Sequence, residues 1–245
     1  MSGPDRFGPT AAQYATYRPR YPAALFAALA GVTPRRAVAW DCATGNGQAA
    51  VALAEQFQRV VASDLSAGQL AHAAAHPRVS YVRARAEAAP LAPRSVDLVT
   101  VAQALHWFDI AAFWTEARRV LAPGGVVAVW CYTLVRVTPG VDALVDRFYH
   151  ETVGPWWPPQ RALTDDGYRS LTLPFAEVAV PPFTIETRLT LDAFLGYLGT
   201  WSAVAAYRAA RGSDPVAALG RELAGVWGAA TQAVRWGLGV RAGRA

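Results

Sequence analysis

The 245-residue chain contains no lysine, because all 23 of its basic residues are arginine. This absence excludes chemistry that needs an ε-amine, such as Schiff-base catalysis, a P-loop phosphate site or a tyrosine–lysine dehydrogenase. The formal net charge is +5, but the arginines occur in scattered pairs such as Arg35 with Arg36 and Arg118 with Arg119, separated by apolar stretches. That distribution predicts no nucleic-acid partner.

Cysteine and histidine are also scarce. Cys42 and Cys131 lie in strongly apolar segments, where a reduced, buried thiol is expected rather than a disulfide. The four histidines lack ligand spacing, so we expect no metal. No run reaches the roughly 18 uninterrupted apolar residues of a membrane span, and the first residues lack a signal-peptide pattern. We therefore expect a soluble, cytoplasmic protein without membrane contacts.

Short β-branched runs alternate with longer alanine-rich stretches between about Ala37 and Tyr132. This pattern is typical of parallel strands joined by crossover helices. Strands are predicted at Val38–Cys42, Arg59–Ser63, Val79–Arg83, Val96–Val101 and Val126–Trp130, and helices at Ala49–Gln56, Ala67–Ala75 and Ile110–Val120. We expect a doubly wound, Rossmann-like α/β fold with a seven-stranded, mostly parallel sheet and helices on both faces.

Length and composition predict one domain over residues 1–245. Within it, residues 1–36 form an N-terminal helical lid, 37–133 the cofactor-binding core, and 134–245 a helical substrate cap with closing strands. The expected elements outside the core are a lid helix over Tyr14–Leu29, a helix over Val141–Arg161 with a Trp156-Trp157-Pro158-Pro159 loop, strand character over Phe175–Leu189, helices from Leu191 and Pro215, and a closing strand at Val234–Arg241.

The most informative segment is Trp40-Asp41-Cys42-Ala43-Thr44-Gly45-Asn46-Gly47-Gln48, in which a strand turns through two glycines into a helix. Glycines let a ligand approach the backbone closely. Gly45, Gly47 and Ala50 also fit the spacing of a dinucleotide site. Asp41 argues against that site, because a carboxylate there repels a pyrophosphate and attracts a cation such as the sulfonium or amino group of S-adenosylmethionine. An aspartate that only stabilises the turn is the alternative.

A second acid, Asp64, lies 17 residues after Gly47, at the end of the next predicted strand. That spacing places a carboxylate beside a ribose diol, which supports a nucleoside without choosing between the two cofactors. Ser66 is expected to cap the following helix. Ala86 and Glu87, beyond the third strand, are candidates for the adenine edge, with a solvated loop as the alternative.

The segment Val101–Phe108 leaves the fourth strand and, where the strand order reverses, flanks the same crevice as the glycine turn. His106 is a candidate to orient or deprotonate an acceptor. A cap or a buried structural contact is an equal alternative for it.

Together these segments resemble the class I methyltransferases, in particular the type 11 group that includes trans-aconitate methyltransferase-like proteins. The resemblance extends to Tyr14–Pro22, Gln103–Phe108, Glu116–Gly125 and Thr200–Ala203. It implies S-adenosylmethionine as cofactor, with Tyr17, Asp41, Ala43, Gly45, Gly47, Asp64, Leu65, Ala86, Glu87 and Gln103 as binding residues. One departure is Ala43, which stands where the family motif has its first glycine.

On the acceptor side, the expected catalytic residues are His106 and Tyr14, and the expected substrate residues are Arg18, Trp107, Tyr132, Trp156 and Trp201. We expect a small-molecule acceptor methylated on a carboxylate or hydroxyl oxygen. A carboxylate needs no base at neutral pH, whereas a hydroxyl would use His106 or a lid tyrosine. The alternatives are a non-catalytic binding protein on the same fold and an NAD-type oxidoreductase. A monomer or homodimer is expected.

Overall fold

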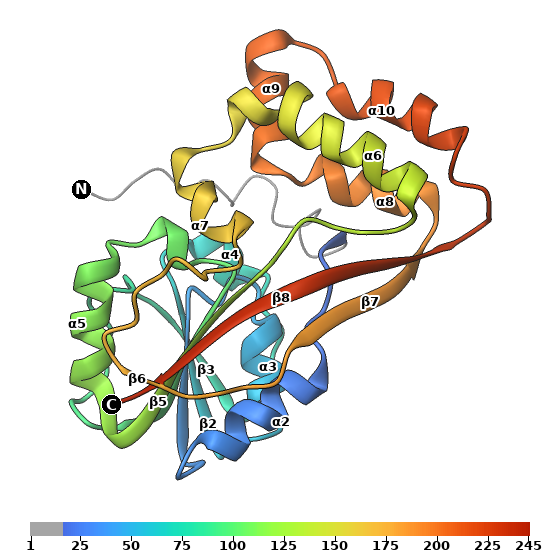
Figure 1. The fold of residues 1–245 in the computed structure, drawn as a ribbon. Coiled ribbons are helices and arrows are strands. Elements are labelled where there is room, and N and C mark those ends of the chain that lie inside the picture. Colours follow the sequence, from blue (N-terminus) through green and yellow to red (C-terminus); the bar gives the residue numbers. More distant parts are fainter. Residues whose placement is uncertain (1–16) are drawn as a thin grey trace.

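The computed structural model describes residues 17–245, with one mixed sheet at its centre (Figure 1). The strands are β1 (Val38–Cys42), β2 (Arg59–Asp64), β3 (Val79–Arg83), β4 (Val96–Ala102), β5 (Leu121–Tyr132), β6 (Ala176–Glu177), β7 (Phe183–Leu189) and β8 (Gln232–Arg244). Their order is β3-β2-β1-β4-β5-β8-β6, with β7 paired to β8. The pairs among β1–β5 are parallel and β8 is antiparallel to β5, which confirms the doubly wound α/β class.

The sheet has eight strands where seven were expected, because the strand character over Phe175–Leu189 divides into β6 and β7. Pro181 and Pro182 lie between the two strands, and proline has no N–H to continue a ladder. The closing strand predicted at Val234–Arg241 is confirmed as the longer β8.

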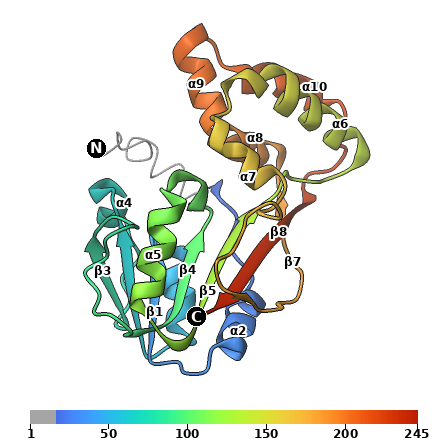
Figure 2. The same ribbon diagram turned by 60° about the vertical axis from the view of Figure 1, so that its left-hand side comes forward.

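Helices pack on both faces of the sheet (Figures 1 and 2). They are α2 (Ala23–Val32), α3 (Gln48–Ala54), α4 (Ala67–Ala71) and α5 (Ile110–Val120). Leu25, Leu29 and Leu53 of α2 and α3 belong to one buried cluster, while Phe113 of α5 belongs to the cluster on the other face. The predicted bounds of α5 are confirmed, and Asp109 caps its first turn by accepting from the amide of Ala112 at 3.1 Å.

The position of β1 in the sheet sets the place of the ligand crevice. β1 lies between β2 and β4, so successive strands are added on one side of β1 up to β3 and on its other side from β4 onward. Asp41 pairs in register with Ala62 of β2 and Thr100 of β4. The loops that follow β1, β2 and β4 therefore leave the same edge of the sheet, where open α/β sheets bind ligands.

A helical cap lies at the C-terminal end of β7 and the N-terminal end of β8 (Figures 1 and 2). Its elements are α6 (Pro139–Arg147), the π-turn η3 (Phe148–Thr152), the 3-10 turns η4 (Gly154–Trp156) and η5 (Pro159–Arg161), α7 (Ala162–Asp165), α8 (Leu191–Gly199), α9 (Ser202–Arg211) and α10 (Pro215–Ala224). β8 pairs with β5 through its C-terminal half and with β7 through its N-terminal half. One strand thus belongs to both the parallel sheet and the base of the cap.

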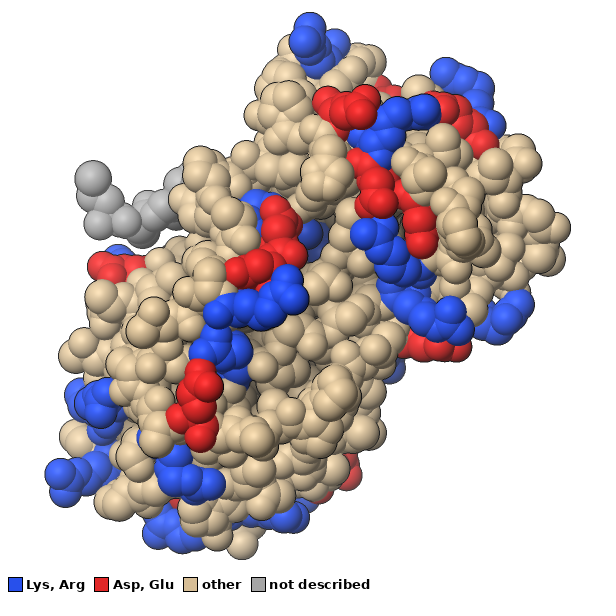
Figure 3. Space-filling model, viewed as in Figure 1, with Lys and Arg blue, Asp and Glu red and all other residues tan. Residues whose placement is uncertain are grey.

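Arginines and acids alternate over the face drawn in Figure 3, and no single basic stripe runs across it. The ion pairs agree with this view, since Arg136 pairs with Asp146 and Arg235 with Glu186. Within residues 17–245, no helix has the length and apolar character needed to cross a membrane.

Candidate functional site

The glycine turn after β1 is built on backbone that favours glycine. Gly45 and Gly47 have φ of 58° and 85°. A Cβ at Gly47 would lie 2.1 Å from the Tyr81 hydroxyl, which donates to the carbonyl of Ala74 at 2.7 Å. Only glycine therefore lets the start of α3 pack against β3. At Gly45 a Cβ would meet only the Gln69 side chain at 3.8 Å, so the backbone there lies open to a close ligand.

Ala43 adopts φ of 55°, in the left-handed region, although it has a side chain. The chain thus places a methyl group on backbone that favours glycine, at the position where the family motif has its first glycine. The left-handed conformation costs a residue with a Cβ about 1–2 kcal/mol. Strain of this kind is common at functional sites, where the surrounding structure holds it.

Asp41 is completely buried between the glycine turn and β4. Its two carboxylate oxygens accept hydrogen bonds from the hydroxyls of Thr44 at 2.5 Å and Thr100 at 2.8 Å. Burial raises the pKa of Asp41 from 3.8 to about 6, although the two threonine hydrogen bonds oppose the shift. Removal from water makes the carboxylate costly to ionise, so a cation nearby would stabilise its charged form.

Asp64 ends β2 and joins two loops. One oxygen accepts from the amide of Gly45 and the other from the amide of Ser66, both at 2.8 Å. Ser66 in turn caps α4 by accepting from the Gln69 amide at 3.2 Å, as the sequence predicted. Leu65, between them, is 43% exposed, which is unusual for a large apolar residue at this edge. A carboxylate beside an exposed apolar side chain suits a ribose with an attached base.

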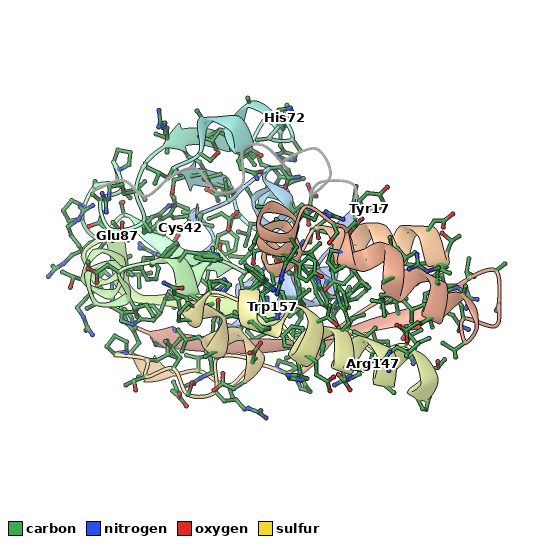
Figure 4. All side chains as sticks on the ribbon, turned by 90° about the horizontal axis from the view of Figure 1, so that it is seen from above. Tyr17, Cys42, His72, Glu87, Arg147 and Trp157 are labelled. Atoms are coloured by element: carbon green, nitrogen blue, oxygen red, sulfur yellow. The ribbon has the colours of Figure 1, made fainter. Side chains whose placement is uncertain are left out.

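The loop after β3 contains the predicted adenine residues. Ala86 packs against the apolar cluster that contains Trp40. Glu87 ion-pairs with Arg85 at 3.4 Å and accepts from the amide of Asp109 at 3.2 Å. Glu87 therefore ties this loop to the start of α5, and its position at the rim of the sheet edge is visible in Figure 4.

Gln103, in the loop after β4, is held between two strands. Its φ of 56° is left-handed, like that of Ala43 after the neighbouring β1. Its amide donates to the carbonyl of Trp130, and its side-chain oxygen accepts from the amide of Tyr132, both at 2.8 Å. The loop is thereby fixed to the end of β5.

His106 lies in the 3-10 turn η2 (Leu105–Trp107) and is 6% exposed. Its Nδ1 lies 3.2 Å from the hydroxyl of Tyr168, and its ring packs 4.7 Å from that of Trp107. Burial, together with the positive charge of Arg161, lowers the pKa of His106 from 6.5 to about 3. The imidazole is therefore neutral at physiological pH and a weak base, which favours the structural alternative for this residue.

Two residues of the N-terminal segment contact the cap. A Cβ at Gly196 of α8 would lie 2.6 Å from the Tyr17 ring, so Tyr17 packs on that helix. Figure 4 shows Tyr17 beside the cap helices and apart from Cys42. Its predicted cofactor contact stays a prediction, and the predicted catalytic Tyr14 lies outside the described residues.

Arg18 is half-buried, and its guanidinium is engaged within the protein. One Nη donates to the hydroxyl of Tyr132 and the other to the carbonyl of Thr200 at 3.2 Å. The guanidinium also lies 5.7 Å from the Tyr132 ring and 5.8 Å from the Tyr197 ring. Arg18 thus joins the N-terminal segment to β5 and to the cap, and its role as an acceptor residue stays a prediction.

The tryptophans predicted for the acceptor occupy different surroundings. Trp201 is buried within an aromatic cluster of the cap, 5.5 Å from the Trp157 ring and 5.6 Å from the Tyr149 ring. Trp156 is half-buried and packs on Tyr207 at 5.9 Å. Trp157, which the sequence analysis named only as part of the Trp156-Trp157-Pro158-Pro159 loop, lies near the centre of Figure 4, between the sheet and the cap helices.

No group of three or more histidines, cysteines or acids within residues 17–245 is arranged to hold a metal ion. Cys42 and Cys131 are buried and unpaired, as their apolar segments indicated. Burial raises the pKa of the Cys131 thiol to about 12, so that thiol stays protonated.

Comparisons with known proteins agree with this geometry. A family model described as a methyltransferase domain matches residues 40–129. A Dictyostelium discoideum protein assigned as a methyltransferase is 34% identical over 214 residues, which cover 86% of this chain and 81% of that protein. A solved structure assigned as a type II methyltransferase, from Anaeromyxobacter dehalogenans, is 50% identical, with a TM-score of 0.87 over 93% of this chain and 98% of that one. The chain belongs to the methyltransferase family.

Another relative of this methyltransferase is the malonyl-[acyl-carrier protein] O-methyltransferase of Dechloromonas aromatica. It is 34% identical over 125 residues, which cover 51% of this chain and 47% of that protein. The family model covers residues 40–129, which include Asp41, the glycine turn and Asp64.

Sequence reasoning missed Arg161, the cation whose charge acts on His106 in this methyltransferase. Arg161 ends η5, with its guanidinium 4.6 Å from the Trp157 ring and 5.7 Å from the Tyr149 ring. Tyr168, with φ of 63° and no exposed surface, was also missed. The Trp156-Trp157-Pro158-Pro159 run marked this loop, but no local pattern indicates that Arg161 reaches His106.

Proposed function

We propose that this methyltransferase transfers a methyl group from S-adenosylmethionine to an oxygen of a small-molecule acceptor, and that the oxygen belongs to a carboxylate. The observation that carries the choice of acceptor is the protonation state of His106. With a pKa of about 3, it is a poor base for a hydroxyl. A carboxylate is already ionised at neutral pH and needs no base.

The other candidate bases support the same choice. Burial raises the pKa of Tyr149 to about 12 and that of Tyr168 well above its usual value, so both stay protonated. A relative that is named a malonyl-[acyl-carrier protein] O-methyltransferase is consistent with oxygen as the acceptor atom. His106, Tyr149 and Tyr168 are therefore unsuited to be the base that an alkyl hydroxyl would require.

The residues at the sheet edge fit S-adenosylmethionine chemically. Asp41 supplies a buried carboxylate for a cation, Asp64 a carboxylate for two hydroxyls, and Leu65 an exposed apolar surface for a base. The open backbone at Gly45 leaves room for close approach between the two acids. S-Adenosylmethionine, when bound, supplies a methyl group already activated by its positive sulfur.

The protein's own contribution is alignment and exclusion of water. The glycine turn and the loops after β2 and β4 fix the cofactor side, while β5 and the cap fix the acceptor side. The attacking oxygen must lie in line with the carbon–sulfur bond, and such positioning contributes roughly 7–11 kcal/mol in favourable cases. No proton transfer is needed when the acceptor is a carboxylate.

Calorimetry and methyl transfer test the proposal in two steps. Titration with S-adenosylmethionine, S-adenosylhomocysteine and NAD should give binding of both S-adenosyl compounds and none of NAD. Transfer of tritiated methyl should then label carboxylic acids, as base-labile esters, faster than matched alcohols and phenols. Binding without transfer to any acid, alcohol or phenol would support the non-catalytic alternative, and preferential labelling of phenols would contradict the carboxylate assignment.

A further inference from the structure

The guanidinium of Arg161 is largely buried, and only its Nε donates hydrogen bonds to other residues within 17–245. Its side chain is 17% exposed, and its Nε donates to the Tyr149 hydroxyl at 3.0 Å and to Asp165 at 3.3 Å. Tyr149 in turn donates to the same Asp165 oxygen at 2.5 Å. Among residues 17–245, neither Nη group of Arg161 has a hydrogen-bond partner. The two Nη groups of this largely buried side chain therefore keep donors that the described residues do not use.

Other partly buried arginines of the same molecule behave differently. Arg119 uses both Nη groups on the carbonyls of Leu91 and Ala89. Arg244 uses both on the carbonyls of Gly124 and Val32. These are arginines with a structural role, and their donors are satisfied within the protein. Arg161 lacks such carbonyl partners, which separates it from that group.

Arg161 lies beside the loop after β4, because η5 (Pro159–Arg161) packs against η2 (Leu105–Trp107). Its charge lowers the pKa of His106, which follows β4, and opposes the rise at Cys131 of β5. The rings of Trp157 and Tyr149 flank the guanidinium at 4.6 and 5.7 Å. Among residues 17–245, Asp165 is the one acid paired with Arg161; it is 48% exposed and reaches only Nε. Because Asp165 engages only Nε, the Nη groups remain suited to a second anion that can accept from both of them.

We propose that Arg161 binds the carboxylate of the methyl acceptor, and that the adjacent Trp157 and Tyr149 rings receive an apolar or aromatic body attached to that carboxylate. The acceptor class is therefore an apolar or aromatic carboxylic acid. Arginine suits this task because its paired N–H groups match the two oxygens of a carboxylate. The inference rests on the proposed carboxylate methyl transfer and assigns its specificity to one residue.

Binding and transfer are measured separately so that the two proposals can fail independently. Phenylacetate, cinnamate and hexanoate are titrated by calorimetry into the full chain saturated with S-adenosylhomocysteine, with phenylacetamide as the neutral analogue. Wild type should bind at least one acid, and phenylacetamide at least tenfold more weakly than phenylacetate. Equal binding of acid and amide, or no binding of any acid, would overturn the proposal.

The variant Arg161→Gln should weaken acid binding at least tenfold and leave the affinity for S-adenosylhomocysteine unchanged. Arg161→Lys keeps the positive charge but loses the paired N–H groups. Its affinity for the acid should therefore lie between those of wild type and Arg161→Gln. Arg147→Gln is the matched control, because Arg147 is half-exposed on α6 and pairs with Glu222 away from this space. Acid binding that is unchanged in Arg161→Gln would refute the assignment. If Arg161→Gln does not fold, Arg161→Lys and the acid–amide comparison in wild type still decide.

The outcomes also separate the inference from the function on which it rests. Acid binding that depends on Arg161, without any methyl ester formed from S-adenosylmethionine, would keep the anion site and remove the carboxylate as the methylated group. Ester formation that is unaffected by Arg161→Gln would keep the function and remove the anion site.

Discussion

The backbone amide of Gly45 donates to the carboxylate of Asp64 across 2.8 Å, so the glycine turn after β1 and the acid that ends β2 form one unit. The second oxygen of Asp64 holds the amide of Ser66 at the start of α4. One carboxylate therefore orients the turn and begins a helix, at the edge where we propose that a ribose diol binds. Loss of the Asp64 carboxylate should weaken cofactor binding and also disturb the glycine turn and the start of α4.

Asp64→Ala should weaken the affinity for S-adenosylhomocysteine at least tenfold. Each hydrogen bond to a charged group contributes about 1.5–3 kcal/mol, and the substitution removes those to the ribose and to Gly45. Calorimetry measures the dissociation constant, and a thermal scan reports folding. Glu55→Ala, an exposed acid at the end of α3, is the control and should change neither quantity by much. An unchanged dissociation constant in Asp64→Ala would remove the ribose assignment.

Cofactor affinity should fall as pH falls through about 6. The free protein has an Asp41 pKa of about 6, and a bound cation lowers that pKa because it stabilises the carboxylate. Below pH 6 binding must therefore displace a proton, which costs up to tenfold in affinity per pH unit. Calorimetry in buffers of different ionisation enthalpy measures the released proton. Asp41→Asn should bind more weakly and lose this pH dependence, whereas a pH-independent wild type would contradict the role of Asp41.

Ala43→Gly should stabilise the free protein by about 0.5–1 kcal/mol. Glycine tolerates φ of 55°, so the substitution releases backbone strain that exceeds the added entropy of the unfolded chain. Urea unfolding followed by circular dichroism measures the change. Ala52→Gly in α3 is the matched control, since there φ is helical and the same substitution should destabilise by about 1 kcal/mol. Destabilisation by Ala43→Gly would mean that contacts of the methyl group outweigh the strain.

His106 should make the fold sensitive to acid without acting as the base. Its folded pKa of about 3 lies below the unfolded value of 6.5, so the unfolded chain binds the proton first. Stability from the neutral imidazole is therefore present above pH 6.5 and is lost as pH falls toward 3, by up to about 1.4 kcal/mol per pH unit. Asp41, with a raised pKa, contributes with the opposite sign between about 3.8 and 6, so the difference between wild type and His106→Gln is the quantity to compare.

In the same variant, kcat should change less than tenfold, because removal of a general base costs about 10²–10⁴. The exposed His72→Gln is the control for both measurements. A loss of several hundredfold in kcat, with the folding curve unchanged, would restore His106 as the base.

The sequence predicts the core of the fold because its signals there are local. The bounds of β1, β3 and α5 follow directly from short apolar runs and from the cap at Asp109. β5 begins five residues before its prediction, because Pro123-Gly124-Gly125 continues the strand after an irregular pairing between β4 and β5 instead of forming a loop. α4 ends at Ala71, four residues before its prediction.

The acceptor side could not be predicted in the same way, because its contacts join distant parts of the chain. Arg161 contacts Tyr149 within one loop, but its effect on His106 spans more than fifty residues. Tyr168 meets His106 from 62 residues away along the chain, at a turn where Gly167 and Tyr168 both take left-handed backbone. Arg18, by contrast, was predicted as a substrate residue. Only the structure reveals that Tyr132 and Thr200 accept hydrogen bonds from its two Nη groups.

β8 limits how the molecule can admit a substrate. Because Gln232–Leu238 pairs with β7 and Leu238–Arg244 pairs with β5, a movement that separated the cap from the sheet here would break ladder hydrogen bonds. Such a rupture belongs to the slow, costly openings of a fold. We therefore expect ligand entry and release to rely on side chains and loops, with the β5–β8–β7 ladder kept as a shared support.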